Sequence, residues 1–208
     1  MSEFQNIGPL GIRVSRTLHH FFVRNIKDAK LIYDHGCGYG GWTSHIAHLV
    51  DGKAAIFDPD EDGCTYTKLL LGDRFLESTG PFDLIMCFGV LELLEEQDQE
   101  QLLKEFRLKL NGRLLIQYNF YNPLALRWLA LRLKYGDSVA WHEKNRFHRT
   151  YFSRRHVETM FRKAGFLIVE KCHPTLENHL PFAVNNVLGP IIPSPFHMTF
   201  FYALEPVS

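Results

Sequence analysis

Residues 34–41 read DHGCGYGG, and this glycine-rich stretch decides the fold of the chain. It follows a short apolar run at residues 31–33 and precedes residues 42–50, whose apolar side chains recur at helical spacing. That order predicts a strand, a tight turn and a helix. Glycines let the backbone turn sharply and let a ligand approach it, and the first turn of the helix offers free N–H groups. Asp34, at the strand end, favours a ligand with a positive charge over a diphosphate.

Strands and helices alternate along the rest of the chain. Strands are expected at residues 31–35, 53–57, 83–88, 113–118, 166–171 and 198–204, and helices at residues 15–26, 41–50, 61–69, 97–110, 153–164 and within 123–136. Asn111-Gly112 is expected to turn the chain into a strand, Ser153 to cap a helix and Gly165 to end it. This alternation predicts an α/β fold whose parallel sheet has helices on both faces. Residues 1–208 show no internal repeat or second core, so one domain is expected.

Composition narrows the classes of partner. Lys+Arg and Asp+Glu both number 23, which gives no bulk attraction to nucleic acid or anionic lipid. The four cysteines form no C-x-x-C pair, which argues against a zinc ribbon or a disulfide framework and favours a cytoplasmic location. The chain start lacks a signal-peptide pattern, and no run reaches the roughly 18 apolar residues of a membrane span. The basic and apolar stripe at residues 126–133 is expected to be a lid or core, with peripheral membrane contact as the alternative.

The glycine spacing alone leaves the cofactor class open. Gly36-x-Gly38-x-x-Gly41 also fits the fingerprint of nicotinamide and flavin enzymes. Asp58 ends the second strand, where a carboxylate accepts hydrogen bonds from both ribose hydroxyls of either class of cofactor. An NAD(P)-dependent oxidoreductase therefore remains an alternative, although Asp34 beside the glycine loop counts against it.

The later segments discriminate between these classes. Five blocks follow one another in order: DHGCGYG, AIFDPD, GDRFLESTGPFDLIMCFGVLELL, LKLNGRLLI and HRTYFSRRHVETMFRKAGF. From about residue 30 to residue 171, this series resembles the class I S-adenosylmethionine-dependent methyltransferases. The resemblance implies a Rossmann-like, doubly wound sheet of seven mostly parallel strands that ends in a C-terminal antiparallel hairpin.

The resemblance also implies which residues bind S-adenosylmethionine. The glycine loop would hold the methionine part, Asp58 the ribose, Asp73 the adenine amino group, and Phe88 would lie beside the transferred methyl. The residues implied for cofactor binding are Asp34, Gly36, Cys37, Gly38, Gly40, Asp58, Pro59, Asp73 and Phe88.

Two positions depart from the family pattern. Leu93 stands where a Leu-Glu-His motif often has its histidine, and Leu110-Asn111-Gly112 replaces the usual Pro-Gly-Gly turn. The first change leaves a catalytic base unassigned, and Glu92 is expected to be a solvated acid at a helix start. His148 and Tyr151 match a block that family members often carry near the acceptor pocket. His148 and Tyr151 are therefore the catalytic candidates, and His148 is the better base because an imidazole titrates near neutral pH. The alternative is a structural role in docking the loop.

No metal site is expected. His142, His148 and His156 are spaced by six and eight residues, which matches no common ligand pattern.

These observations predict methyl transfer from S-adenosylmethionine to a small-molecule or lipid-like acceptor. Residues 1–25, 119–150 and 174–197 are rich in aromatic residues, Leu and Pro, and are expected to cover the acceptor side. An acceptor with an apolar or aromatic portion would fit such a pocket. A non-catalytic module that binds the cofactor and serves a partner protein is the other alternative, because of Leu93.

Overall fold

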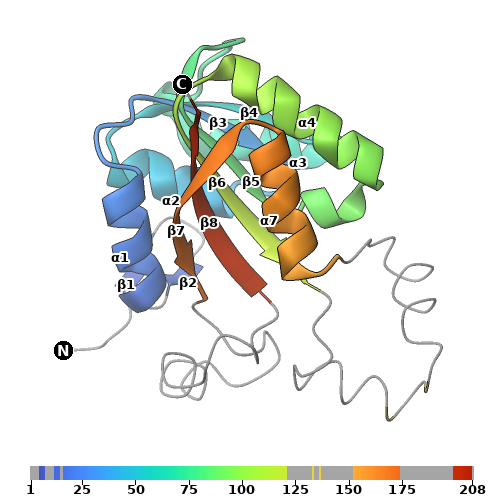
Figure 1. Cartoon of the computed structure of the whole chain (residues 1–208). Helices are drawn as coiled ribbons and strands as arrows, with labels where there is room; N and C mark the ends of the chain where they lie inside the picture. Colours follow the sequence, from blue (N-terminus) through green and yellow to red (C-terminus); the bar gives the residue numbers. More distant parts are fainter. Residues whose placement is uncertain are drawn as a thin grey trace.

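The structure, a computed structural model, describes most of the chain (Figure 1). The described residues are 5–7, 12–14, 16–120, 133, 136, 152–173 and 199–207.

Six strands form the main sheet in the order β4-β3-β5-β6-β8-β7. They are β3 (Leu31–His35), β4 (Lys53–Phe57), β5 (Phe82–Phe88), β6 (Leu110–Asn119), β7 (Phe166–Cys172) and β8 (Thr199–Pro206). Strands β3 to β6 are parallel to one another, and β8 is antiparallel to both β6 and β7. The mostly parallel sheet and its antiparallel C-terminal pair confirm the sequence-based expectation. A separate two-stranded sheet pairs β1 (Gln5–Ile7) with β2 (Ile12–Val14).

The described residues supply six strands to the main sheet, where seven were expected. Among the described residues, only Phe75 forms a bridge beside β4 at the open edge, with Ala54. The N–H of Leu76 donates to the carbonyl oxygen of Ala54 at 2.9 Å, and the pairing stops there. The run before β5 is short and contains Pro81, and a proline cannot donate to a ladder. In the part of the chain that the structure describes, the edge position therefore holds a single bridge instead of a strand.

Helices cover both faces of the sheet. One face carries α1 (Arg16–Asn25), α2 (Gly41–Leu49) and α3 (Glu61–Leu71), and the other carries α4 (Glu96–Lys109) and α7 (Arg154–Lys163). Figure 1 shows α1 on one side of the sheet and α4 with α7 on the other. Each layer has its own apolar core; Phe21, Phe22 and Ile46 belong to the first and Leu103 and Phe161 to the second. The fold is therefore doubly wound, as expected.

The ends of α7 lie where the sequence predicts them. The hydroxyl of Ser153 accepts a hydrogen bond from the N–H of His156 at 3.3 Å, which caps the helix. Gly165 follows the helix with φ of +83°, a conformation that costs a glycine little.

The pair Asn111-Gly112 lies inside β6, and the expected turn there is wrong. A Cβ on Gly112 would stand 2.1 Å from the carbonyl oxygen of Asp83 on β5. The two strands shift register between Phe82 and Leu84 at this place. The glycine thus permits the close approach of two strands.

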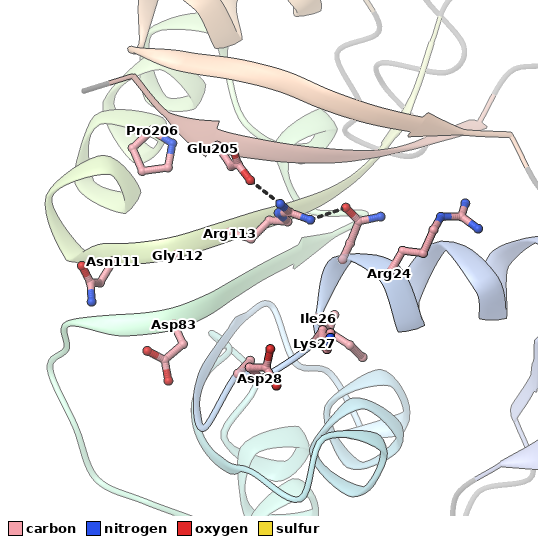
Figure 2. A pocket seen from close by; sticks show the side chains of 12 residues that line it. Arg24, Ile26, Lys27, Asp28, Asp83, Asn111, Gly112, Arg113, Glu205 and Pro206 are labelled. Carbon is pink, nitrogen blue, oxygen red and sulfur yellow. Dashed lines mark hydrogen bonds and ion pairs between the residues drawn. The ribbon is translucent and has the colours of Figure 1, made fainter.

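Polar side chains fasten the end of α1 to the amino edge of the sheet. The side-chain amide of Asn25 donates to Glu170 at 2.6 Å, and Arg113 donates to Asn25 at 2.7 Å and to Glu205. Figure 2 shows Arg113 reaching toward Glu205 across this edge. Asn25, Arg113 and Glu205 line an open cavity of about 550 Å³. Because they bond to one another, this edge serves to hold α1 in place.

Candidate functional site

The site lies at the carboxyl edge of the sheet, between β3 and β5. These two strands are neighbours, but the chain continues from β3 to β4 on one side and from β5 to β6 on the other. Such a switch in strand order leaves a crevice outside the carboxyl ends, where open α/β sheets bind their ligands. Residues 36–40 follow β3 and residues 89–93 follow β5, so both loops border the crevice.

The glycine loop is tied to the end of β4. The N–H groups of Gly36 and Cys37 both donate to the carbonyl oxygen of Phe57, at 2.7 and 3.1 Å. The N–H of Gly38 donates to Oδ2 of Asp58 at 2.7 Å. The predicted strand, turn and helix therefore form, and the turn is fixed against the second strand.

Close approaches explain two of the glycines. A Cβ on Gly36 would stand 2.1 Å from a methyl group of Val90, in the loop after β5. A Cβ on Gly40 would stand 2.7 Å from the side chain of Thr67 on α3, and Gly40 has φ of +73°. The structure thus brings the loops after β3 and β5 into contact.

Asp34 is a buried acid beneath the glycine loop. It is only 2% exposed, and the hydroxyl of Thr43 donates to its Oδ2 at 2.5 Å. Burial raises the pKa of Asp34 to about 7; the Thr43 hydrogen bond opposes this shift, and the charge of Asp58 adds to it. No ion pair formed by the described residues involves Asp34. A buried carboxylate without a cation is costly, so this position favours a positively charged ligand group.

Asp58 joins two parts of the site. Its Oδ1 accepts from the N–H of Asp60 at 2.9 Å, while its Oδ2 accepts from Gly38. Asp60 in turn caps α3 by accepting from the N–H of Asp62 at 3.1 Å. Pro59 stands exposed between the two acids. A carboxylate has about four lone-pair sites, so Asp58 keeps acceptor capacity for two further hydrogen-bond donors.

Phe88 ends β5 at the same edge, and its ring packs against aromatic rings from α1, α2 and β8. The ring stacks on Phe22 of α1 with centroids 6.0 Å apart, and lies 5.7 Å from Trp42 and 5.4 Å from Phe201. It is half-buried. Phe88 thus joins an aromatic cluster that links α1 and α2 to the crevice.

The structure does not bring Asp73 to this edge. Asp73 lies in η1 (Gly72–Arg74), after α3 has run back across the sheet. The next residue, Arg74, donates to Asp51 at 2.8 Å, and Asp51 precedes the first residue of β4. Asp73 therefore lies at the amino edge, opposite Asp58. A short segment runs from Phe75 along β4 toward the carboxyl edge, and the acidic residue on this segment is Glu77.

Other predicted features lie outside the described residues. These are His148, Tyr151, nearly all of the expected helix within 123–136, and most of the segments expected to cover the acceptor side.

A buried polar chain at the carboxyl edge was missed by the sequence-based reasoning. Glu92, in η2 (Leu91–Leu93), is 0% exposed, so its expected solvated position is wrong. The side-chain amide of Asn119 donates to Glu92 at 2.5 Å, and the hydroxyl of Thr199 donates to Asn119 at 2.5 Å. Asn119 ends β6 and Thr199 begins β8. The signal available in the sequence was Asn119, a polar residue directly after the strand predicted at residues 113–118. The burial of Glu92, however, depends on tertiary contacts.

The described residues contain no cluster of three or more His, Cys, Asp or Glu side chains able to hold a metal ion. Their helices include none of the length and apolar character needed to cross a membrane.

Comparison with known proteins identifies the family. A family model described as a methyltransferase domain matches residues 12–171. The chain belongs to this family, which confirms the resemblance to class I S-adenosylmethionine-dependent methyltransferases. A search of curated proteins found no match.

Solved structures show the same fold. A methyltransferase from Clostridium acetobutylicum shares 10% identity with a TM-score of 0.62, and the match covers 92% of this chain and 90% of that one. A putative methyltransferase complexed with the Haloferax volcanii Trm112 activator shares 14% identity with a TM-score of 0.64, covering 92% and 89%. The mitomycin 7-O-methyltransferase MmcR shares 14% identity with a TM-score of 0.60, covering 88% of this chain. The present chain spans only 50% of the length of MmcR.

The burial of Asp34 predicts how a neutral analogue changes stability with pH. Its folded pKa, about 7, exceeds the ordinary value of 3.8, so the native state binds more protons between these values and loses stability as pH rises through this range. Asp34→Asn has no charge to desolvate. We expect it to raise the unfolding free energy of the ligand-free protein by about 1–3 kcal/mol at pH 8. The gain should shrink as the pH falls toward 4.

Urea unfolding at pH 8, 6 and 4 measures this effect. Asp73→Asn, at an exposed position on the opposite edge, is the matched control and should change stability by less than about 0.5 kcal/mol at each pH. A gain for Asp34→Asn that is absent at pH 8, or equal at all three pH values, would contradict the argument.

Proposed function

We propose that this chain transfers a methyl group from S-adenosylmethionine to a small-molecule or lipid-like acceptor. The observation that carries the proposal is Asp34, a carboxylate buried beneath a glycine loop at the switch point of the sheet. A diphosphate would meet a like charge there. A cofactor with an ammonium and a sulfonium would supply the missing positive charge.

The residues at the carboxyl edge fit this cofactor. We assign the glycine loop and Asp34 to its methionine part, and Asp58 with Pro59 to its ribose. The close contact between Gly36 and Val90 supports a cradle in which backbone, not side chain, faces the ligand. Glu77 replaces Asp73 as our candidate for the adenine end, because it follows the bridge at Phe75 toward the correct edge.

Methyl transfer from S-adenosylmethionine requires mainly that the two reactants be positioned correctly. S-adenosylmethionine supplies a methyl group already activated by its sulfonium, so the protein must hold the acceptor in line with it. Orienting two reactants in this way can remove about 7–11 kcal/mol from a barrier. The aromatic cluster around Phe88 supports a rigid wall on one side of the crevice.

The proposed class of acceptor is based on the composition of two segments and on the structural similarity to one known methyltransferase. Residues 119–150 and 174–197 are rich in aromatic and apolar side chains, which suits an acceptor with an apolar portion. MmcR, which shares this fold, methylates a small molecule according to its name. Both support a small or lipid-like acceptor rather than a macromolecule.

The proposal predicts which ligands stabilise the protein. S-adenosylhomocysteine should raise the melting temperature and NAD should not, because the site suits a nucleoside whose amino-acid tail carries an ammonium group. A ligand at 100 times its dissociation constant stabilises by about 2.7 kcal/mol. A thermal-shift panel with S-adenosylmethionine, S-adenosylhomocysteine, NAD and NADP measures this. Stabilisation by NAD or NADP alone would replace the proposal with an oxidoreductase.

Asp58 should contribute to cofactor affinity as well as to structure. Hydrogen bonds to a charged group are worth about 1.5–3 kcal/mol each, so Asp58→Ala should weaken S-adenosylhomocysteine by about tenfold to several hundredfold. Asp58→Asn, which keeps one acceptor oxygen, should weaken it less. Calorimetric titration of the folded variants gives the affinities.

Asp60→Ala separates affinity from stability. It removes the cap of α3, which costs about 1 kcal/mol of stability, but no ribose contact is assigned to Asp60. We expect unchanged affinity for this control. Should Asp58→Ala behave like Asp60→Ala, with lower stability and the same affinity, Asp58 would leave the proposed site.

We retain His148 and Tyr151 as the proposed catalytic residues, with His148 as the base for a hydroxyl acceptor. Substitution should then reduce turnover more than cofactor affinity, because neither residue is assigned to the cofactor. Initial rates of His148→Ala and Tyr151→Phe on the identified acceptor, beside S-adenosylhomocysteine titrations, test this. Full turnover in both variants would remove the assignment.

A further inference from the structure

A buried polar chain crosses the carboxyl edge of the sheet at three neighbouring strands. Glu92 lies in η2, directly after β5, while Asn119 ends β6 and Thr199 begins β8. These strands follow one another in the order β5-β6-β8, and Asn119 is the direct partner of Thr199 in the β6–β8 register. Glu92 is 0% exposed, and the other two residues are buried as well. The chain therefore lies inside the protein, at the edge that carries the proposed cofactor site.

The acid gives this chain of hydrogen bonds its direction. A carboxylate only accepts, so Asn119 turns its amide NH2 group toward Glu92 and donates to it at 2.5 Å. The amide oxygen of Asn119 then faces the other way and accepts from the Thr199 hydroxyl at 2.5 Å. A buried carboxylate is costly without hydrogen bonds, and bonds to an ionised acceptor are stronger than neutral ones. Glu92 thus fastens η2 to the ends of β6 and β8.

The turn that carries Glu92 also carries a wall of the crevice. Val90 stands directly before η2, and one of its methyl groups fills the space beside Gly36, where a Cβ would stand only 2.1 Å from it. The carbonyl oxygen of Val90 accepts from the N–H of Leu93 at 2.8 Å, so Val90 and η2 form one turn. A displacement of η2 would therefore move Val90 relative to the glycine loop.

We propose that Glu92 is a positioning residue for the cofactor: by binding Asn119 it holds η2, and with it Val90, against the glycine loop. This role rests on the proposed function, which takes that loop as the cofactor site. Leu91 also anchors η2, because it is fully buried in the core on the α4 side of the sheet. Apolar packing is non-directional, however, and the hydrogen bond of Glu92 supplies the direction. Glu92 acts through Val90 and needs no contact of its own with the cofactor.

Two substitutions of Glu92 separate the hydrogen bond from the bulk of the side chain. Glu92→Leu removes the acceptor, and we expect about tenfold weaker binding of S-adenosylhomocysteine, the equivalent of one hydrogen bond. Glu92→Gln keeps an oxygen that can accept from Asn119, so its affinity should stay within about threefold of wild type. Asn119→Leu should weaken binding as Glu92→Leu does. The double variant should lose no more than either single one, because both changes break the same bond.

The experiment measures affinity and stability separately in the full chain. Calorimetric titration with S-adenosylhomocysteine gives the dissociation constants, and urea unfolding of each variant gives the free energy of unfolding. Glu158→Gln is the matched control, because Glu158 is another buried acid, 8% exposed, which accepts from Lys171 at 2.8 Å. Glu158 lies in α7, and no role at the cofactor loop is assigned to it. We expect this control to lower the stability and to leave the affinity unchanged.

Several results would overturn the inference. They are an unchanged affinity in Glu92→Leu, a loss in Glu92→Gln as large as that in Glu92→Leu, additive losses in the double variant, or an equal loss in the Glu158→Gln control. Where leucine prevents folding, Thr199→Val removes only the hydroxyl that bonds to Asn119. It should weaken binding by about threefold, and unchanged affinity would again contradict the role of the chain. Wild type that fails to bind S-adenosylhomocysteine would refute the proposed function and this role with it, whereas binding that no variant alters would refute the role of Glu92 alone.

Discussion

The carboxylate of Asp58 is the contact on which the carboxyl edge of the sheet depends. One oxygen accepts from the N–H of Gly38 and the other from that of Asp60, so a single side chain joins the glycine loop to the turn before α3. Hydrogen bonds to an ionised acceptor are stronger than neutral ones. The shape of the loop and the acceptor capacity offered to a ligand therefore have the same origin. A substitution here changes both, and this is why a control at Asp60 is needed to separate them.

Asp34 shows the cost of preparing a site for a charged ligand. The carboxyl group is buried with Thr43 as its hydrogen-bond donor, and the nearby charge of Asp58 raises its pKa further. Two acids close together disfavour each other's ionised form. The arrangement destabilises the empty protein at neutral pH, and a ligand cation would relieve it. Affinity for a cation and stability without ligand are thus opposed at this position.

Sequence reasoning succeeded where local chemistry decides the outcome. The cap at Ser153, the stop at Gly165 and the glycine turn depend on residues within a few positions of one another. It failed where distant segments decide. The burial of Glu92 needs Asn119, and the edge position of Asp73 depends on the direction in which α3 crosses the sheet. Neither arrangement is encoded in nearby residues, so the sequence alone did not predict the burial of Glu92 or the amino-edge position of Asp73.

Helix α1 connects the two edges of the sheet. At the amino edge its last residue, Asn25, is bonded to Glu170 and Arg113. Phe22, in the same last turn of α1, stacks on Phe88, which ends β5 beside the crevice. The directional hydrogen bonds that fix this end of the helix therefore also limit the freedom of the Phe22 ring. The polar network at the amino edge therefore sets the position of the aromatic wall at the proposed site, although no residue of that network lies near the chemistry.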